Sequence, residues 1–233
     1  DGVTPLISAL LNKDYPIVEM LIEAGTDVNM AANQSLTPLM IAIGPGGANL
    51  GIIKILLKAG AQVNARGTHG LTCLMIASAL EADANIIAAF IEAGADVNMR
   101  DENGRTALWY ATAINELAVP LLIEAGADVN AGDIDGTTPL MIIACHGNPN
   151  LRILRLLIKA GADVNAKEQN RLTPLMIAAK STPNPDVISI LLEAGADAKA
   201  KDVNGKTAFD YTKGNEHLKG TDAYWTLSDA RFD

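Results

Sequence analysis

Histidine and cysteine are the first candidates for chemistry in this sequence, because both can bind metals or take part in nucleophilic catalysis. The histidines His69, His146 and His217 are 77 and 71 residues apart, so they do not form the close pairs of a zinc site. Cys73 and Cys145 are expected to be buried thiols without a disulfide. No Ser/His/Asp, Cys/His or carboxylate pattern stands out. The sequence therefore predicts no catalytic residue, no metal site and no enzyme.

A glycine-rich stretch, "GPGGANLG" at 44–51, could suggest a phosphate-binding loop. It lacks the Lys-Ser/Thr pair that would hold the phosphate and its metal ion. Gly and Pro are also the usual residues of a plain connector. We therefore expect a loop between two helices and no bound cofactor.

Composition narrows the possible partners. The net charge is −9 and the isoelectric point is about 4.8, so binding to nucleic acid or to an acidic membrane surface is not expected. No apolar run approaches the roughly 18 residues of a membrane span, so membrane insertion is not expected. The chain is 49% apolar but only 4% aromatic, which favours a core of thin, closely stacked layers.

A repeated unit becomes visible when the chain is aligned on the threonine of "LTPLMIA", a heptapeptide found at both 36–42 and 172–178. Successive threonines are 32 to 35 residues apart, and the glycine of "EAGADVN" follows the same period. Each such glycine precedes the next threonine by 12 residues. A period of this length indicates a repeat array. The threonines are Thr4, Thr37, Thr72, Thr106, Thr138, Thr173 and Thr207.

Each unit carries the signals of two short helices and a hairpin. The threonine can cap a first helix, and Pro38 can take its first position without losing a hydrogen bond. A second helix ends at a glycine such as Gly60, after which the chain runs extended, turns and returns. These "TPL" starts and "AGADVN" endings resemble the ankyrin repeat over residues 1–213. The resemblance implies an all-α repeat solenoid that binds other proteins on a concave face of hairpins and first helices.

We expect a single ankyrin-repeat domain over 1–233, present as a monomer, with six full repeats and a modified C-terminal capping repeat. The cap should end in a helix whose Tyr224, Trp225, Leu227 and Phe232 cover the last repeat. Because the chain opens inside a repeat, we also expect residues upstream of Asp1. A cytoplasmic location is favoured, and secretion stays open. The expected repeats are 1–31, 32–66, 67–100, 101–132, 133–167 and 168–201, followed by the cap at 202–233.

A methionine column replaces the histidine that the family usually carries in "TPLH". It consists of Met40, Met75, Met141 and Met176, with Trp109 at the same position in the central repeat. Such a column could form a soft, adaptable binding surface. We favour packing between layers, because apolar stripes at structural spacing are usually core.

Three further features of the repeats lead to structural predictions. Ser35 and Arg171 replace the glycine of the hairpin tip, so those tips should differ in shape. Pro120 requires that the second helix of its repeat begin near Leu117. An asparagine column is expected to form hairpin hydrogen bonds. It consists of Asn29, Asn64, Asn98, Asn130 and Asn165.

The function expected from the resemblance is non-catalytic binding of another protein. The alternative is a regulatory or targeting domain cut from a larger enzyme or membrane protein. Trp109 and Arg105 are the expected anchors, because Trp, Tyr and Arg dominate interface energies. Hairpin tips and first-helix ends would supply the rest of the face. The candidate protein-binding residues are His69, Glu102, Asn103, Arg105, Trp109, Ile134, Asp135, His146, Gln169, Asn170, Arg171 and Lys180.

Overall fold

The computed structural model describes residues 2–32, 36–44 and 48–230. Within these ranges the chain is helical, with one isolated antiparallel bridge between Ala32 and Leu36. The chain divides into two compact units, Asp1–Ala127 (unit 1) and Asp128–Asp233 (unit 2). The borders expected for the single repeats stay a prediction.

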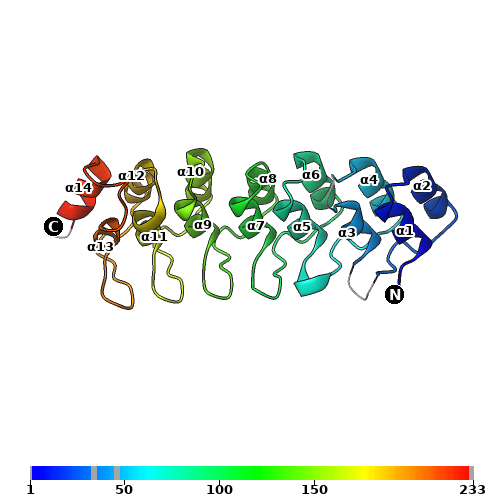
Figure 1. The fold of residues 1–233 in the computed structure, drawn as a ribbon, viewed down its shortest axis with the longest axis horizontal. Helices are drawn as coiled ribbons and strands as arrows, with labels where there is room; N and C mark the ends of the chain where they lie inside the picture. The colour runs from blue at the N-terminus through cyan, green and yellow to red at the C-terminus, as the bar shows by residue number, and fades with distance from the viewer. Residues whose placement is uncertain (1, 33–35, 45–47, 231–233) are drawn as a thin grey trace. The chain divides into compact units, whose positions relative to one another are not determined.

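Unit 1 is built from helix pairs. The first helices of the pairs are α1 (Pro5–Leu11), α3 (Pro38–Ala42), α5 (Cys73–Ala79) and α7 (Ala107–Ala113). The second helices are α2 (Tyr15–Glu23), α4 (Leu50–Lys58), α6 (Ala84–Glu92) and α8 (Ala118–Glu124). A short 3-10 turn, η1 (Thr68–Gly70), forms one hairpin tip. First and second helices lie in separate layers, and the hairpin loops project on the side of the first helices (Figure 1).

Unit 2 repeats this arrangement and then departs from it at its end. The first helices are α9 (Pro139–Cys145), α11 (Pro174–Ser181) and α13 (Ala208–Thr212). Their partners are α10 (Leu151–Lys159), α12 (Asp186–Glu193) and α14 (Asp222–Asp229). The expected final helix is thus present as α14, which packs against α12 and α13.

The covering face of α14 differs from the expected one. Leu227 is 1% exposed and Tyr224 is half-buried, whereas Trp225 is 56% exposed. Trp225 therefore does not cover the last repeat, because it lies on the opposite side of the helix from the buried Ala223 and Leu227. Phe232 lies outside the described residues.

The threonine column forms the helix starts that the sequence predicts. In each first helix from α1 to α11 the threonine hydroxyl accepts a hydrogen bond from the backbone N–H three residues on, at 3.2–3.4 Å. Such a cap stabilises a helix by about 1 kcal/mol. Thr207 differs, because its backbone N–H and its hydroxyl both donate to the Asp210 carboxylate at 3.0 Å.

The methionine column packs between the layers, as favoured. Met40, Met75, Met141 and Met176 are between 0% and 3% exposed. A thioether buried to this degree cannot form an adaptable outer surface. The column therefore belongs to the core, together with the leucines and isoleucines of both helix layers.

The structure confirms the prediction made for Pro120 and contradicts the one made for Arg171. Helix α8 begins at Ala118 with Leu117 as its cap residue, so Pro120 lies in the first turn and the prediction is confirmed. The differently shaped tip expected at Arg171 is wrong. Its φ is +61° and its N–H bonds Glu168 O at 2.7 Å, the same turn that Gly104 forms with Asp101. The turn hydrogen bonds hold Arg171 in the left-handed region. Ser35 lies outside the described residues.

The asparagine column links consecutive repeats. Each Nδ2 donates at 3.0 Å to the carbonyl of the glycine that ends the second helix of the next repeat, as from Asn64 to Gly94. Asn64 Oδ1 also accepts from Asp96 N at 2.8 Å. The asparagines of the hairpins thus form hydrogen bonds as expected, and the structure adds that the partners belong to the following repeat.

Candidate functional site

Buried carboxylates hold the hairpin tips in shape. Asp101 is only 7% exposed, and its Oδ1 accepts from the backbone N–H groups of Asn103 and Arg105, both at 2.8 Å. The Tyr110 hydroxyl donates to Asp101 Oδ2 at 2.7 Å. Burial and this hydrogen bond raise the pKa of Tyr110. The tip of this repeat is therefore a fixed, hydrogen-bonded turn.

The same hydrogen-bonding pattern occurs in unit 2. There the carboxylates of Asp133, Glu168 and Asp202 each accept two backbone N–H groups of their own tip, at 2.8–3.0 Å. At Asp202 the Tyr211 hydroxyl again donates to the second oxygen, at 2.6 Å. That bond lowers the pKa of Asp202, while burial and Asp202 raise the pKa of Tyr211 to about 12. Sequence reasoning missed this role. The signal was an acidic residue five positions before the threonine in four successive repeats.

The candidate tip residues of unit 1 come together at two neighbouring tips. His69 and Glu102 have exposed side chains, and His69 Nδ1 lies 3.4 Å from Glu102 Oε2. Glu102 N also donates to His69 O at 3.0 Å, which joins the tips through the backbone. Asn103 is exposed beside them. These side chains form a polar edge to the first-helix layer.

Arg105 and Trp109 form one stacked pair in unit 1. The guanidinium carbon of Arg105 lies 4.3 Å from the centre of the Trp109 ring, and Trp109 packs edge-on against Tyr110. Both are half-buried, and Arg105 Nε and Trp109 Nε1 have no hydrogen-bond partner in the described part of the chain. A cation stacked in this way is stabilised on the ring face while part of its surface stays accessible.

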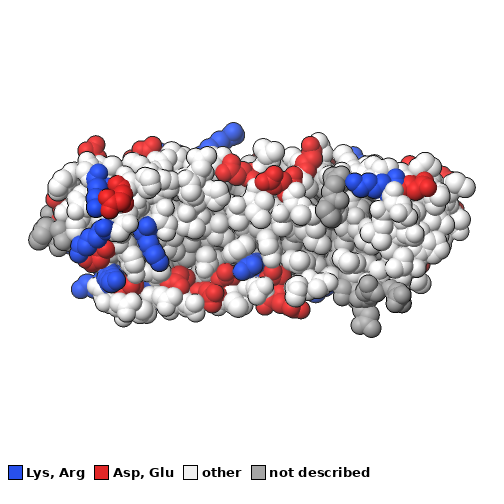
Figure 2. Space-filling view, in the orientation of Figure 1, with Lys and Arg blue, Asp and Glu red and all other residues white. Residues whose placement is uncertain are grey.

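Exposed apolar side chains mark the ends of the first helices in unit 1. Leu80 follows α5 and is 49% exposed, and Ile114 holds the same position after α7 at 43%. Leu11, the last residue of α1, is 62% exposed. The middle of this face carries few charged atoms (Figure 2). Together Leu11, Leu80 and Ile114 are called the apolar row of unit 1; they lie at first-helix ends, which the sequence predicts to belong to the face, although the sequence did not single out Leu11.

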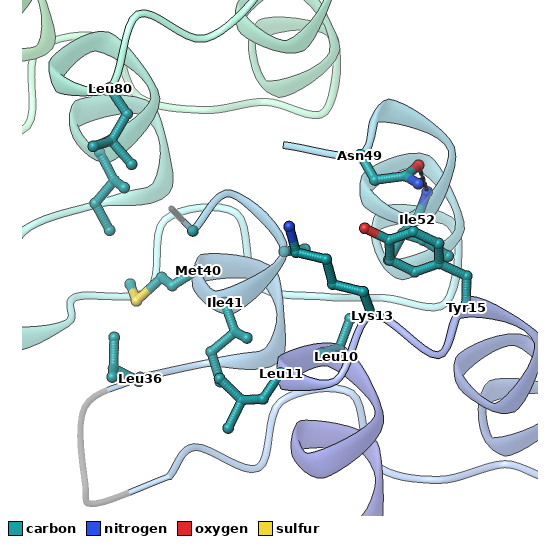
Figure 3. A pocket seen from close by; sticks show the side chains of 13 residues that line it. Leu10, Leu11, Lys13, Tyr15, Leu36, Met40, Ile41, Asn49, Ile52 and Leu80 are labelled. Carbon is teal, nitrogen blue, oxygen red and sulfur yellow. Dashed lines mark hydrogen bonds between the residues drawn. The ribbon is translucent and has the colours of Figure 1, made fainter. Parts of the chain in front are cut away.

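An apolar pocket of about 330 Å³ lies beside this row, between α1, α3, α4 and α5 (Figure 3). Leu10, Leu11, Met40 and Ile41 are among its walls, and the side chain of Lys13 points toward its centre. This pocket could not be predicted from the sequence, because its lining residues come from separate repeats.

The candidate residues of unit 2 lie on its own tips and first-helix ends. Gln169 N donates to Asp135 O at 2.8 Å, and Asn170 O accepts from Val203 N at 3.0 Å, so adjacent tips are again joined. Ile134 is 71% exposed at its tip. His146 caps the end of α9 and Lys180 lies in the last turn of α11, and both are exposed.

The two cysteines differ in accessibility. Cys73 is fully buried, and burial raises the pKa of its thiol to about 12. Cys145 is exposed, so the expectation of a buried thiol is wrong there, because Cys145 is the last residue of α9. Neither forms a disulfide.

No cluster of three or more metal-ligating side chains occurs among the described residues. In the same ranges, none of the helices has the length and apolar character needed to cross a membrane. Residues 45–47 of the glycine-rich stretch lie outside the described residues, while Asn49 caps α4 through its bond from Ile52 N.

Comparison with known proteins adds two findings. A family model described as ankyrin repeats, in three copies, matches 1–67, 39–133, 74–168, 112–202 and 140–219. The crystal structure of the ankyrin repeat domain of Bcl-3, described as a unique member of the IkappaB protein family, is similar with a TM-score of 0.75 and 28% sequence identity. The match covers 94% of this chain and 100% of that one. No curated protein sequence matches significantly.

Proposed function

We propose that this chain, which belongs to the ankyrin repeat family, binds a partner protein through a first-helix face on each unit. This face consists of the hairpin tips and the exposed sides and ends of the first helices. The all-α solenoid of stacked repeats expected from the sequence is confirmed. Ankyrin repeats generally mediate protein–protein interactions and are non-catalytic.

The row of Leu11, Leu80 and Ile114 carries the proposal. A group of large, exposed apolar side chains often marks an interaction site, whereas single exposed apolar side chains are common on any protein surface. Here Leu11 and Leu80 line an apolar pocket, and the polar tip residues His69 and Glu102 lie on the hairpins that precede α5 and α7. An apolar centre with a polar rim is the usual anatomy of an interface.

Arg105 and Trp109 would act as anchors beside this row. Their stacking fixes both side chains before a partner arrives, which reduces the entropy lost on binding. The carboxylate of Asp101 fixes the tip in the same way. In unit 2 the corresponding face would use Ile134, His146 and the tip residues of the next repeats.

A pair of matched double variants tests the face. Leu80→Glu with Ile114→Glu places two carboxylates on the row, while Ile17→Glu with Met20→Glu places two on α2 at side chains that are 46% and 67% exposed. Tagged proteins are used for capture from source lysate with quantitative mass spectrometry, after circular dichroism shows equal helicity. We expect a protein that wild type and the α2 variant retain and the row variant loses.

Two results would overturn the proposal. If the row variant retains every protein that wild type retains, the partner binds elsewhere. If the α2 variant loses the same protein, the second-helix layer is the binding face instead.

A further inference from the structure

We infer that the first-helix face of unit 2 binds a short acidic segment of a partner protein. This inference rests on the proposed protein-binding function and names the chemistry of the partner. It is carried by a concentration of positive charge in a chain whose net charge is −9.

The positive charge comes from the hairpins and first helices of the last two repeats, residues 167–181 and 199–213. These ranges contain seven cationic and three acidic residues, and blue side chains gather over this part of unit 2 in Figure 2. The cationic residues are Lys167, Arg171, Lys180, Lys199, Lys201, Lys206 and Lys213, and all are exposed.

The three carboxylates in these ranges are bound internally. Glu168 and Asp202 are 9% and 4% exposed and are occupied by the backbone N–H groups of their own tips. Asp210 accepts from Lys213 Nζ at 2.9 Å and from the backbone of Thr207. A partner approaching this face therefore meets mainly cationic side chains, although Lys213 is paired with Asp210, the exposed Asp197 lies beside Lys199, and the buried carboxylates reduce the total field.

The two ranges form one surface. Helices α11 and α13 pack against each other, and Val203 N donates to Asn170 O at 3.0 Å, which places the two tips side by side. Neighbouring packed helices are about 8–10 Å apart, so equivalent residues such as Lys167 and Lys201 are separated by about that distance. Several carboxylates on one short segment can therefore be engaged together.

An acidic polypeptide fits this surface better than a nucleic acid does. Unit 2 as a whole has twelve Lys and Arg against fourteen Asp and Glu, so a long polyanion would extend onto repelling carboxylates. The face also lacks an exposed aromatic ring for base stacking among its described residues, because Tyr211 is half-buried and bonded to Asp202. Val203, 56% exposed at the tip, offers contact to an apolar residue within the segment.

Matched charge reversals test the inference. Lys167→Glu, Lys180→Glu and Lys201→Glu change side chains that form no hydrogen bond or ion pair in the described part of the chain. The control, Arg152→Glu, Arg155→Glu and Lys159→Glu, makes the same charge change on α10, in the second-helix layer of the same unit. Binding is measured by fluorescence anisotropy with a labelled twelve-residue peptide in which glutamate alternates with alanine, and with its glutamine counterpart.

We expect wild type and the α10 control to bind the glutamate peptide and not the glutamine peptide, with weaker binding as salt rises from 50 to 200 mM. The first-helix variant should bind at least tenfold more weakly. The inference is overturned if the peptide fails to bind, or if both variants lose binding equally. Tighter binding of a labelled twelve-nucleotide single strand, or of phosphatidylserine vesicles, would also overturn it.

The two proposals fail separately. Loss of a captured protein on Leu80→Glu with Ile114→Glu supports the protein-binding function whatever the peptide does. Peptide binding by unit 2, together with a row variant that retains every protein that wild type retains, would leave the acidic-segment site and overturn the binding face proposed for unit 1.

Discussion

The asparagine links between repeats allow a prediction with a calculable size. Asn64 forms two hydrogen bonds to the next repeat, from Nδ2 to Gly94 O at 3.0 Å and from Asp96 N to Oδ1 at 2.8 Å. Gly94 comes just after the end of α6. Backbone carbonyls at the end of a helix have no hydrogen-bond donor within the helix, so the Gly94 carbonyl needs a partner from elsewhere. Asn64→Ala removes both bonds at once.

Each intramolecular hydrogen bond contributes about 0.5–1.5 kcal/mol net. The site is exposed, so water can replace the lost partners and the lower part of the summed range applies. We therefore expect Asn64→Ala to reduce the free energy of unfolding by about 1–2 kcal/mol. Asn103→Ala is the control, because the Asn103 side chain is exposed and forms none of these links, and it should change stability by less than about 0.5 kcal/mol.

Urea unfolding followed by circular dichroism measures both variants. Because a repeat array can unfold in stages, hydrogen exchange of residues 84–100 should be followed as well. Faster exchange there in Asn64→Ala, and not in Asn103→Ala, is the expected result. A loss below about 0.5 kcal/mol for Asn64→Ala, or equal losses for the two variants, would refute the stabilising role of the link.

Three further predictions concern single sites. Backbone and lysine hydrogen bonds lower the pKa of Asp210 to about 2, and a depressed carboxyl pKa stabilises at neutral pH and loses that contribution as the pH falls. Asp210→Asn should therefore be less stable than wild type at pH 7, and urea titrations should show the difference closing between about pH 4 and pH 2; a constant difference would contradict this. Under native conditions a thiol reagent should modify Cys145 and not Cys73, as read by mass spectrometry; modification of both would show that the buried site opens readily. Gly136→Ala should destabilise more than Gly205→Ala in thermal unfolding, because both have positive φ but only a Cβ at Gly136 would lie 3.2 Å from Glu168 Cα; equal melting temperatures would show that the backbone moves aside.

The repeat and its local elements could be predicted from sequence because they depend on neighbours only a few residues away. A threonine followed by proline caps a helix through a bond three residues on, and a glycine ends one through its own backbone freedom. The constant spacing of 12 residues from each helix-ending glycine to the next threonine repeats these signals along the chain. The same logic correctly placed the start of α8 near Leu117, which leaves Pro120 in the first turn of the helix.

The roles of single residues within the site could be predicted only in part. Exposed tips such as His69 and the exposed helix end at His146 were correctly expected, because insertions and polar residues collect at surfaces. The sequence predicted no role for Asp101 or Asp202, yet both are buried acceptors of hydrogen bonds from their own tips. Composition shows that a carboxylate is present, but the direction of its side chain depends on how the hairpin folds back.

The sequence by itself determined the repeat, its two helices and the family, and it favoured packing for the methionine column, because periodic short-range patterns carry that information. Tertiary structure alone decided which groups a partner can reach. The inward bonds of the tip carboxylates, the links from each asparagine to the next repeat and the pocket beside Leu11 all join residues from separate turns or repeats. Such contacts depend on how one repeat lies against the next, and no local pattern specifies that.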